Sequence, residues 1–521
     1  MLINIHGAMC LGIEAVKVTV EVDISPGLGI HLVGLADEAV KESLLRTITA
    51  LQCLNFRIPG KKIVINLAPA DMHKRGSGYD LPIALGIIAA SGQLEMPVLD
   101  KYIVMGELGL DGSVREVAGA IPIAELAERD GFEGCILPEA SALEAVELRN
   151  TKVYGVSSLA DVLRIVVNEE DSDDLLIWNK LPVLWEYSKG RGVSAGGGYM
   201  DFSEIIGQEG AKRGLEIAAA GGHNVLMIGP PGSGKSSLAK ALAGILPPMD
   251  KEEAIMTSKI YSVAGKGRLR FGLMTERPFR SPHYSASLAA IIGGGSSDNI
   301  IPGEVSLAQN GILFLDEFAQ IPKSVSEALR GPLEDRKVTI SRLRSKVEYP
   351  SSFMLVAASN PCPCGYYGEE DRCTCTVGQR QAYLGRLSGP IMDRIDVQLW
   401  MHPVEASKLV EKPKGETSAM VAARVLKARK IQQNRFKGLG IHTNSEMNNR
   451  QMNVFCRLDT ECKETMERLI GRMGLSARAF SRVIKLARTI ADLAGVPDIR
   501  ISDLLEAASY RFLDKTCPHH R

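Results

Sequence analysis

The sequence of 521 residues has no long apolar run, since none approaches the roughly 18 residues that a transmembrane helix needs. It has no excess of charge of either sign, because Lys plus Arg and Asp plus Glu both number 61. Its first residues lack the basic segment and apolar core of a secretory signal. We therefore expect no membrane partner, and any nucleic-acid surface must be local rather than global.

A disulfide framework is also missing. Six of the ten cysteines stand singly, at Cys10, Cys53, Cys135, Cys456, Cys462 and Cys517. This distribution is typical of a reduced compartment and predicts a cytoplasmic location. The other four cysteines form two Cys-x-Cys pairs between residues 362 and 375.

Apolar patterning predicts an α/β chain of two or three domains. The segments KVTVEVDIS and KKIVINLAP alternate like half-buried strands, and LPIALGIIAASG is typical of a buried helix. The predicted parts are an α/β domain over 1–168, a linker over 169–200, a parallel α/β sheet domain over 201–403 and a helical domain over 404–521. In the last part, Ser476 is expected to cap an amphipathic helix.

A strand followed by the pattern G-x-x-x-x-G-K-S predicts a phosphate-binding P-loop. Its glycines let backbone N–H groups converge on phosphate oxygens, and the following helix points its positive end at the anion. Lys235 is expected to neutralise the β- and γ-phosphates, and the Ser236 hydroxyl to bind Mg²⁺. A plain glycine-rich turn is the alternative, and the strand–loop–helix context argues against it. The predicted nucleotide-binding residues are Gly229, Pro230, Pro231, Gly232, Ser233, Gly234, Lys235, Ser236, Ser237 and Asp316.

Two more strand ends complete the predicted ATP and Mg²⁺ site. The run GILFLDE ends in Asp316, which would join Ser236 around Mg²⁺, and Glu317, which would orient and deprotonate the attacking water. The run FMLVAASN ends in Asn360, which could help to place that water. An acidic loop and an Asn that merely closes a strand are the alternatives.

The cysteine cluster lies on the loop 361–376, directly after Asn360. Four thiolates, at Cys362, Cys364, Cys373 and Cys375, would close a tetrahedral Zn²⁺ site with no open position, which predicts a structural metal. The Cys-x-Cys spacing is tighter than that of most zinc sites. A disulfide pair or an iron–sulfur cluster are the alternatives. The loop would support the nucleotide site rather than carry the chemistry.

Together these residues resemble the magnesium-chelatase-like branch of the AAA+ ATPases, and further motifs resemble the ComM/YifB family. Those motifs are RPFRSPH from Arg277, PGEVSLAQNG from Pro302, NPCPCG from Asn360 and SGPIMDRID from Ser388. The resemblance covers essentially the whole chain. It implies a Lon-protease-like N-terminal domain, a P-loop AAA+ domain and a C-terminal helical lid. It also implies an ATP-driven, hexameric DNA helicase or translocase that promotes branch migration on branched or single-stranded DNA, as in natural transformation.

The same resemblance implies two arginine roles. Arg394 matches the arginine finger that reaches the ATP of a neighbouring subunit, and Arg478 matches the second sensor. A salt bridge to Asp393 or Asp396 is the structural alternative for Arg394. A solvated basic helix face is the alternative for Arg478.

The Lon-like domain lacks the residues of a working peptidase. Gly78 stands where the nucleophilic Ser would be, Ser77 is one position off, and Ile121 replaces the activating Lys. We therefore expect a scaffold or a DNA-contacting module.

DNA contacts are predicted on a basic, alternating stretch that is typical of a hairpin. Related ring helicases place a hairpin here in the pore, where Lys337, Arg342, Arg344 and Lys346 would track phosphates. An edge hairpin with protective charges is the alternative. The Gly-rich loop from Gly293 is a second candidate pore element.

Two rival functions remain at this point. One is a motor that remodels a protein partner, as in magnesium chelatase, and the other is a nucleotide-switched assembly factor. Stimulation of ATP turnover by DNA would distinguish the helicase from both.

Overall fold

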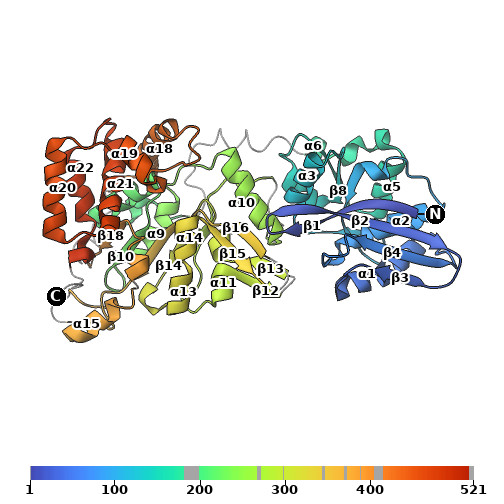
Figure 1. The fold of residues 1–521 in the computed structure, drawn as a ribbon, viewed down its shortest axis with the longest axis horizontal. Helices are drawn as coiled ribbons and strands as arrows, with labels where there is room; N and C mark the ends of the chain where they lie inside the picture. The colour runs from blue at the N-terminus through green and yellow to red at the C-terminus, as the bar shows by residue number, and fades with distance from the viewer. Residues whose placement is uncertain are drawn as a thin grey trace.

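Two β-sheets and a bundle of helices follow one another along the long axis of the molecule (Figure 1). The computed structural model describes residues 2–180, 199–266, 272–296, 299–342, 346–368, 372–387, 389–403 and 415–515. The α/β class predicted from the sequence is confirmed. None of the helices in these ranges is long and apolar enough to cross a membrane.

The N-terminal part is built on a mixed sheet with the strand order β3-β4-β2-β1-β5-β8-β9. Its central strands β1, β2 and β4 pair antiparallel, and the remaining neighbours pair parallel. The elements are β1 (Leu2–Leu11), β2 (Glu14–Ser25), β3 (Ile30–Val33), α1 (Glu38–Cys53), β4 (Lys62–Ala68), α2 (Asp80–Ala90), β5 (Tyr102–Val104), β6 (Glu107–Leu108), β7 (Val114–Arg115), α3 (Ala120–Arg129), β8 (Gly134–Pro138), α4 (Glu139–Ala142), β9 (Lys152–Val156), α5 (Leu159–Val167) and α6 (Ile177–Lys180).

Strand β2 and helix α2 correspond to the alternating and the apolar segments noted in the sequence. Strand β2 buries alternate residues such as Val18, Val20 and Val22, because successive side chains of a strand point to opposite faces. Helix α2 is buried at every one of its residues, which explains why it is apolar all round.

Residues 169–180 differ from the linker that the sequence predicted. They form a 3-10 helix (Glu169–Leu175) and then α6, and Leu175 and Ile177 join the N-terminal hydrophobic core. The acidic composition of this run drew attention away from its two apolar residues. Their burial packs residues 169–180 onto the N-terminal domain. Folded structure therefore extends past residue 168.

The central part is a sheet of five parallel strands in the order β11-β14-β17-β10-β18. Because all strands run the same way, their carboxyl ends meet at one edge and their amino ends at the other. Its elements are α8 (Glu209–Gly221), β10 (Val225–Ile228), α9 (Lys235–Ala243), α10 (Lys251–Val263), β11 (Phe279–Arg280), α11 (Leu288–Ile292), α12 (Glu304–Leu307), β14 (Ile312–Leu315), α13 (Lys323–Ala328), α14 (Arg330–Asp335), β17 (Met354–Ser359), α15 (Val377–Leu384), α16 (Gly389–Met392) and β18 (Val397–Trp400).

Two antiparallel hairpins pack beside this sheet (Figure 1). One joins β12 (Gly293–Ser296) to β13 (Asn299–Pro302), and the other joins β15 (Lys337–Ser341) to β16 (Lys346–Pro350). The Tyr349 hydroxyl donates to the Ile300 carbonyl at 2.9 Å and ties the two hairpins together.

The C-terminal part consists of helices that share a hydrophobic core with one face of the central sheet. Ser476 caps α21 as predicted, since its hydroxyl accepts the Ala479 N–H at 3.2 Å. The helices are α18 (Ser418–Arg435), α19 (Asn449–Phe455), α20 (Thr460–Met473), α21 (Ala477–Ala494) and α22 (Ile501–Ser509).

Among the described residues, the N-terminal part contacts the central part at several points, including helix α10 and the turn between β1 and β2. Lys259 of α10 forms ion pairs with Glu125 at 2.6 Å and Glu14 at 3.2 Å. The turn between β1 and β2 reaches the second hairpin, where Ile13 packs on the central core and Gly12 lies against Val347.

Candidate functional site

The P-loop lies between β10 and α9 at the carboxyl edge of the central sheet. The Lys235 ammonium donates to the carbonyls of Gly229 at 2.7 Å and Pro230 at 2.8 Å. Burial lowers the pKa of Lys235, while the nearby Asp316 carboxylate opposes that shift. Gly232 and Gly234 have φ of +77° and +88°, and the space that a Cβ would occupy there is open. The loop is therefore an uncovered cradle with a buried cation at its base, which fits a polyphosphate.

The predicted metal ligands come together from different strands. The Ser236 hydroxyl, at the start of α9, donates to Asp316 at the end of β14, over 3.0 Å. A hydroxyl and a carboxylate oxygen at this separation can share one Mg²⁺ ion. The next residue, Glu317, has φ of +50°, which is unusual for a residue with a side chain, and its N–H donates to Asp316 at 2.8 Å. The turn holds two adjacent carboxylates in different orientations.

Asn360 ends β17, which lies between β14 and β10. Its side-chain oxygen is 3.4 Å from the Lys235 ammonium, and the carbonyl of the preceding Ser359 accepts the Gly229 N–H at 3.2 Å. Residues that are far apart in the sequence thus meet at the position that the three strand ends predicted. Their assigned chemical roles stay predictions.

The two predicted catalytic arginines lie at the opposite, amino edge of the sheet. Arg394 precedes β18, is 2% exposed and forms an ion pair with Glu334 of α14. Burial lowers the pKa of its guanidinium. The salt bridge expected as an alternative thus exists, but with Glu334 rather than with Asp393 or Asp396.

Arg478 lies on the first turn of α21 and forms an ion pair with Asp393 at 3.0 Å. One turn further along, Arg482 pairs with the buried Asp396 at 2.9 Å. Arg394 and Arg478 line one cavity of about 290 Å³. The structure therefore brings the two arginines to each other, and not to the P-loop of their own chain.

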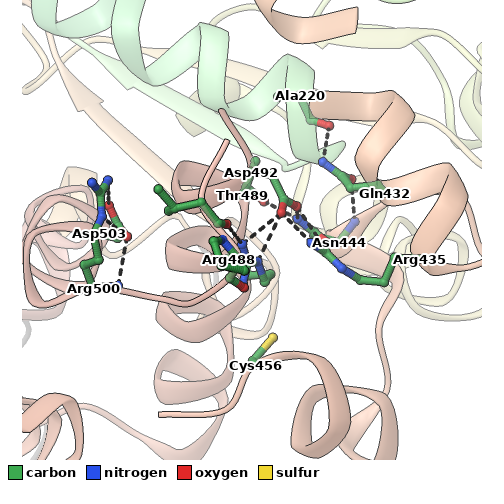
Figure 2. Close-up of polar contacts among 12 residues, drawn as sticks. Ala220, Gln432, Arg435, Asn444, Cys456, Arg488, Thr489, Asp492, Arg500 and Asp503 are labelled. Atoms are coloured by element: carbon green, nitrogen blue, oxygen red, sulfur yellow. Dashed lines mark hydrogen bonds and ion pairs between the residues drawn. The ribbon is translucent and has the colours of Figure 1, made fainter. Parts of the chain in front are cut away.

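A buried polar network fixes α21, which carries Arg478, to the rest of the chain (Figure 2). Asp492 accepts from Arg435 at 2.5 Å, from Arg488 at 3.0 Å and from Asn444 at 2.8 Å. Gln432 in turn donates to the carbonyl of Ala220 on α8 at 3.1 Å. Because Asp492, Arg488, Asn444 and Gln432 are buried and Arg435 is mostly so, the network holds α21 at a defined position relative to the sheet.

The four clustered cysteines converge on one point. Their sulfur atoms all lie within 4.8 Å of one another, with Cys362 at 3.3 Å from Cys364 and 3.8 Å from Cys373. At a Zn–S distance of about 2.3 Å, tetrahedral geometry places sulfurs about 3.8 Å apart. The cluster therefore fits a single tetrahedral ion despite its tight Cys-x-Cys spacing, and it leaves too little room between the thiols for the several irons of an iron–sulfur cluster. A backbone hydrogen bond from Tyr366 lowers the pKa of Cys364 to about 6, whereas burial and the neighbouring thiols raise the pKa of Cys375 to about 11.

The basic hairpin shows one buried and one exposed face. Val338 and Ile340 are buried, whereas Lys337, Arg342 and Lys346 are exposed. Lys337 pairs with Glu348 across the strands at 3.2 Å. Arg344 lies outside the described residues. The exposed cations fit both readings that the sequence left open, a DNA-tracking surface and a protected edge.

The Lon-like turn contains no serine–lysine pair. The Ser77 hydroxyl donates to Glu107, and the buried Lys74 donates to the carbonyl of Pro69. The turn opens on a cleft of about 1200 Å³ that Lys346 and Tyr349 of the second hairpin also line.

Sequence reasoning missed the partners of the predicted residues. Glu334, which pairs with Arg394, lies in the short helix α14, which carries no motif, and only its place before the basic hairpin could have drawn attention to it. Gln208, whose amide donates to the Ser233 carbonyl of the P-loop at 3.4 Å and to His402 at 2.6 Å, carries no sequence signal at all.

Comparison with known proteins identifies the family. Residues 201–409 match the family "Magnesium chelatase, subunit ChlI", residues 20–141 match "Subunit ChlI of Mg-chelatase" and residues 415–511 match "Magnesium chelatase, subunit ChlI C-terminal". An archaeal Lon protease of Methanocaldococcus jannaschii is 25% identical over 177 residues, which are 31% of this chain and 27% of the protease.

Two full-length relatives are closer in sequence. Protein YifB of Salmonella typhimurium is 41% identical over 519 residues, covering 99% of this chain and 98% of YifB. Competence protein ComM of Haemophilus influenzae is 41% identical over 511 residues, covering 97% of each chain. The motifs predicted this relationship, and the chain belongs to the ComM/YifB family of magnesium-chelatase-like AAA+ proteins.

Proposed function

We propose that the protein is an ATPase that works as a ring and moves DNA, promoting branch migration during recombination. The observation that carries the ATPase assignment is the meeting of Lys235, Ser236, Asp316 and Asn360 at one sheet edge. Bound ATP supplies the transferable γ-phosphoryl group. Lys235 neutralises its phosphates, Ser236 and Asp316 hold Mg²⁺, and Glu317 orients and deprotonates the attacking water.

The separation between the two ends of the central sheet supports the proposed ring. Arg394 and Arg478 lie at the amino edge and Lys235 at the carboxyl edge. Each chain would therefore contribute its arginines at one subunit interface and its P-loop at the other. A neighbouring chain that places its arginines over this P-loop completes the site, and repetition of that head-to-tail contact closes a ring. A hexamer is the size that family membership favours.

DNA is the favoured load for two reasons. ComM, at 41% identity, is named a competence protein, which links this relative to DNA uptake. The hairpin β15–β16 also exposes Lys337, Arg342 and Lys346 on one side, where they can track a phosphate backbone. The Lon-like domain serves in this scheme as a scaffold, since Ser77 and Lys74 are each bonded elsewhere.

We also propose a structural Zn²⁺ ion at Cys362, Cys364, Cys373 and Cys375. The convergence of all four sulfur atoms within 4.8 Å supports it. Four protein thiolates leave no position for a substrate, so the ion would stabilise the loop and take no part in the reaction.

Unwinding and branch migration of forked and Holliday-junction DNA, measured with and without ATP, test the proposal. We expect activity that needs ATP and is lost in Lys235→Ala. A second assay separates the DNA contacts from the ATP site: Lys337→Ala with Lys346→Ala should weaken DNA binding and its salt dependence, while turnover without DNA persists. Lys323→Ala with Lys240→Ala removes the same charge elsewhere and is the matched control.

The rival function is the remodelling of a protein partner without DNA unwinding. The match to the magnesium chelatase subunit over residues 201–409 favours it. ATP turnover that is indifferent to DNA in every form would count against the helicase and in favour of this rival.

A further inference from the structure

The four-cysteine loop touches the P-loop. Gly365 directly follows Cys364, and a Cβ at Gly365 would lie 3.0 Å from the Cγ and Cδ atoms of Pro231. Gly365 has φ of +88°, and its N–H donates to the Cys362 carbonyl at 3.0 Å. The turn that carries two of the cysteines is thus packed against the phosphate-binding loop without space for a side chain.

A second contact reaches the same site from the other side of the turn. Asn360 precedes Cys362 by two residues and approaches the Lys235 ammonium at 3.4 Å. The carbonyl of Ser359 accepts the first N–H of the P-loop, at Gly229, over 3.2 Å. Only Pro361 separates Cys362 from Asn360, so the backbone joins the cysteine turn directly to the residue beside Lys235.

The outer side of the loop is fastened to the body of the domain. The Arg380 guanidinium of α15 lies 4.3 Å from the ring centre of Tyr367, and Tyr367 meets the edge of Trp400 on β18 at 6.3 Å. Within the loop itself, the Arg372 guanidinium lies 4.2 Å from the ring centre of Tyr366. Because the loop contacts the P-loop on one side and α15 and β18 on the other, we expect a loss of order at the cysteines to change the P-loop as well.

We propose that the four-cysteine metal site and the nucleotide site are thermodynamically coupled, so that Zn²⁺ raises the affinity for ATP. This inference rests on the proposed ATPase and goes beyond it, because it gives the metal site control over nucleotide binding. Coupling is reciprocal, so ATP must raise the affinity for Zn²⁺ by the same factor. The expected factor is about 5-fold to 150-fold, the range of a typical coupling between two sites.

The test measures zinc affinity in the full chain by competition with a chromogenic chelator of known affinity. We expect the affinity to be at least about fivefold higher with the slowly hydrolysed analogue ATPγS than without nucleotide. A fluorescent ATP analogue should bind correspondingly more weakly to the zinc-stripped chain, and added Zn²⁺ should restore its affinity. Lys235→Ala, which disables the nucleotide site, should show no effect of ATPγS on zinc affinity.

Two further variants keep the test independent of misfolding. Pro231→Ala removes the ring that packs on Gly365. At ATPγS concentrations that saturate this variant, we expect the coupling factor to fall toward one, whatever the change in the ATP affinity itself. Cys53→Ser changes an exposed cysteine outside the cluster and should retain the full factor.

The outcomes separate this inference from the proposed function. Equal zinc affinities with and without ATPγS, in a chain that binds and hydrolyses ATP, overturn the coupling and leave the ATPase standing. A chain that binds no zinc overturns both the metal site and the coupling. A zinc-loaded chain that binds no ATP overturns the ATPase itself.

Discussion

The two edges of the central sheet hold different kinds of charge. At the carboxyl edge, Lys235 is bonded to backbone carbonyls and faces an open glycine cradle. At the amino edge, Arg394, Arg478 and Arg482 each have a carboxylate partner from their own chain. The first edge is arranged to receive an anion. At the amino edge, the arginines stay paired with carboxylates of their own chain unless another anion displaces those carboxylates.

This difference is what a site shared between subunits requires. A cation that binds ATP within its own chain can stay exposed to nucleotide at all times. A cation that acts on a neighbour's ATP needs a temporary partner, and under the finger role proposed for Arg394 its ion pair with Glu334 would supply one. The predictions below test whether the two edges are halves of one site, and they run from the largest expected effect to the smallest.

The largest effect should come from mixing two inactive variants. Lys235→Ala and Arg394→Ala should each lose about 10³-fold or more in ATP turnover, because one loses the phosphate cation and the other the transition-state cation. In mixed rings, an Arg394→Ala chain keeps an intact P-loop and receives Arg394 from a Lys235→Ala neighbour. Turnover should therefore reappear on mixing, as measured by phosphate release. If the mixture stays inactive under conditions where the variants co-assemble, the two edges do not form one site.

Glu317→Gln should separate binding from hydrolysis. The amide keeps the shape of the side chain but cannot take a proton, so turnover should fall by about 10²-fold to 10⁴-fold. ATP should remain bound and unhydrolysed in the isolated protein. Asp335→Asn, which alters an acidic residue at the end of α14, provides the control. Rapid hydrolysis by Glu317→Gln protein would assign the base to another residue.

Arg478→Ala should have a smaller effect than Arg394→Ala. Loss of one electrostatic donor to a transition state costs about 10²-fold in turnover, and the exposed Arg478 is not expected to exceed that. Arg482→Ala serves as the comparison, because it removes the partner of the buried Asp396 and should lower the melting temperature as well. Equal melting temperatures for the two variants would contradict this division between a functional and a structural arginine.

The smallest effect concerns stability at the amino edge. Burial, together with repulsion from Arg482, lowers the pKa of Lys485 from 10.5 to about 8. Between these values the unfolded chain holds more protons than the folded one, so the free energy of unfolding should rise with pH across this window. Lys485→Met should abolish that rise and stabilise the protein by about 2 kcal/mol at pH 7, after the loss of the hydrogen bond to Ser445.

Thermal unfolding of both proteins between pH 7 and pH 10.5 checks this prediction. A mutant that is less stable than the wild type at pH 7 would show that the Lys485 hydrogen bond outweighs its desolvation.

The sequence predicted the carboxyl edge far better than the amino edge. The P-loop, Asp316, Glu317 and Asn360 follow strands directly, so local patterns were sufficient to place them together. The partners of the arginines come from separate elements: Glu334 lies in α14, and Asp393 and Asp396 reach α21 only because the lid packs on the sheet. Such pairs depend on the angle between helices, which no short pattern encodes.

At the cysteine cluster the sequence suggested less order than the structure shows, and the predicted linker is a second such case. The Cys-x-Cys spacing is tighter than that of a typical zinc loop, yet all four sulfur atoms converge, with Cys362 and Cys364 joined by the tight turn at Gly365. The acidic composition of residues 169–180 suggested a linker, although Leu175 and Ile177 suffice to pack them on the domain. In both segments one or two residues, rather than the average composition, decided the local structure.

The contact of Gly12 with Val347 has a mechanical consequence. Strands β1 and β2 are paired along the whole length of Leu2–Leu11 and form a stiff two-stranded ribbon. The turn at its end contacts the hairpin β15–β16 (Figure 1). A Cβ at Gly12 would lie 2.8 Å from Val347, so there is no free space at this contact. A displacement of the hairpin would therefore bend or tilt the β1–β2 ribbon. The N-terminal sheet, to which this ribbon belongs, would resist the movement.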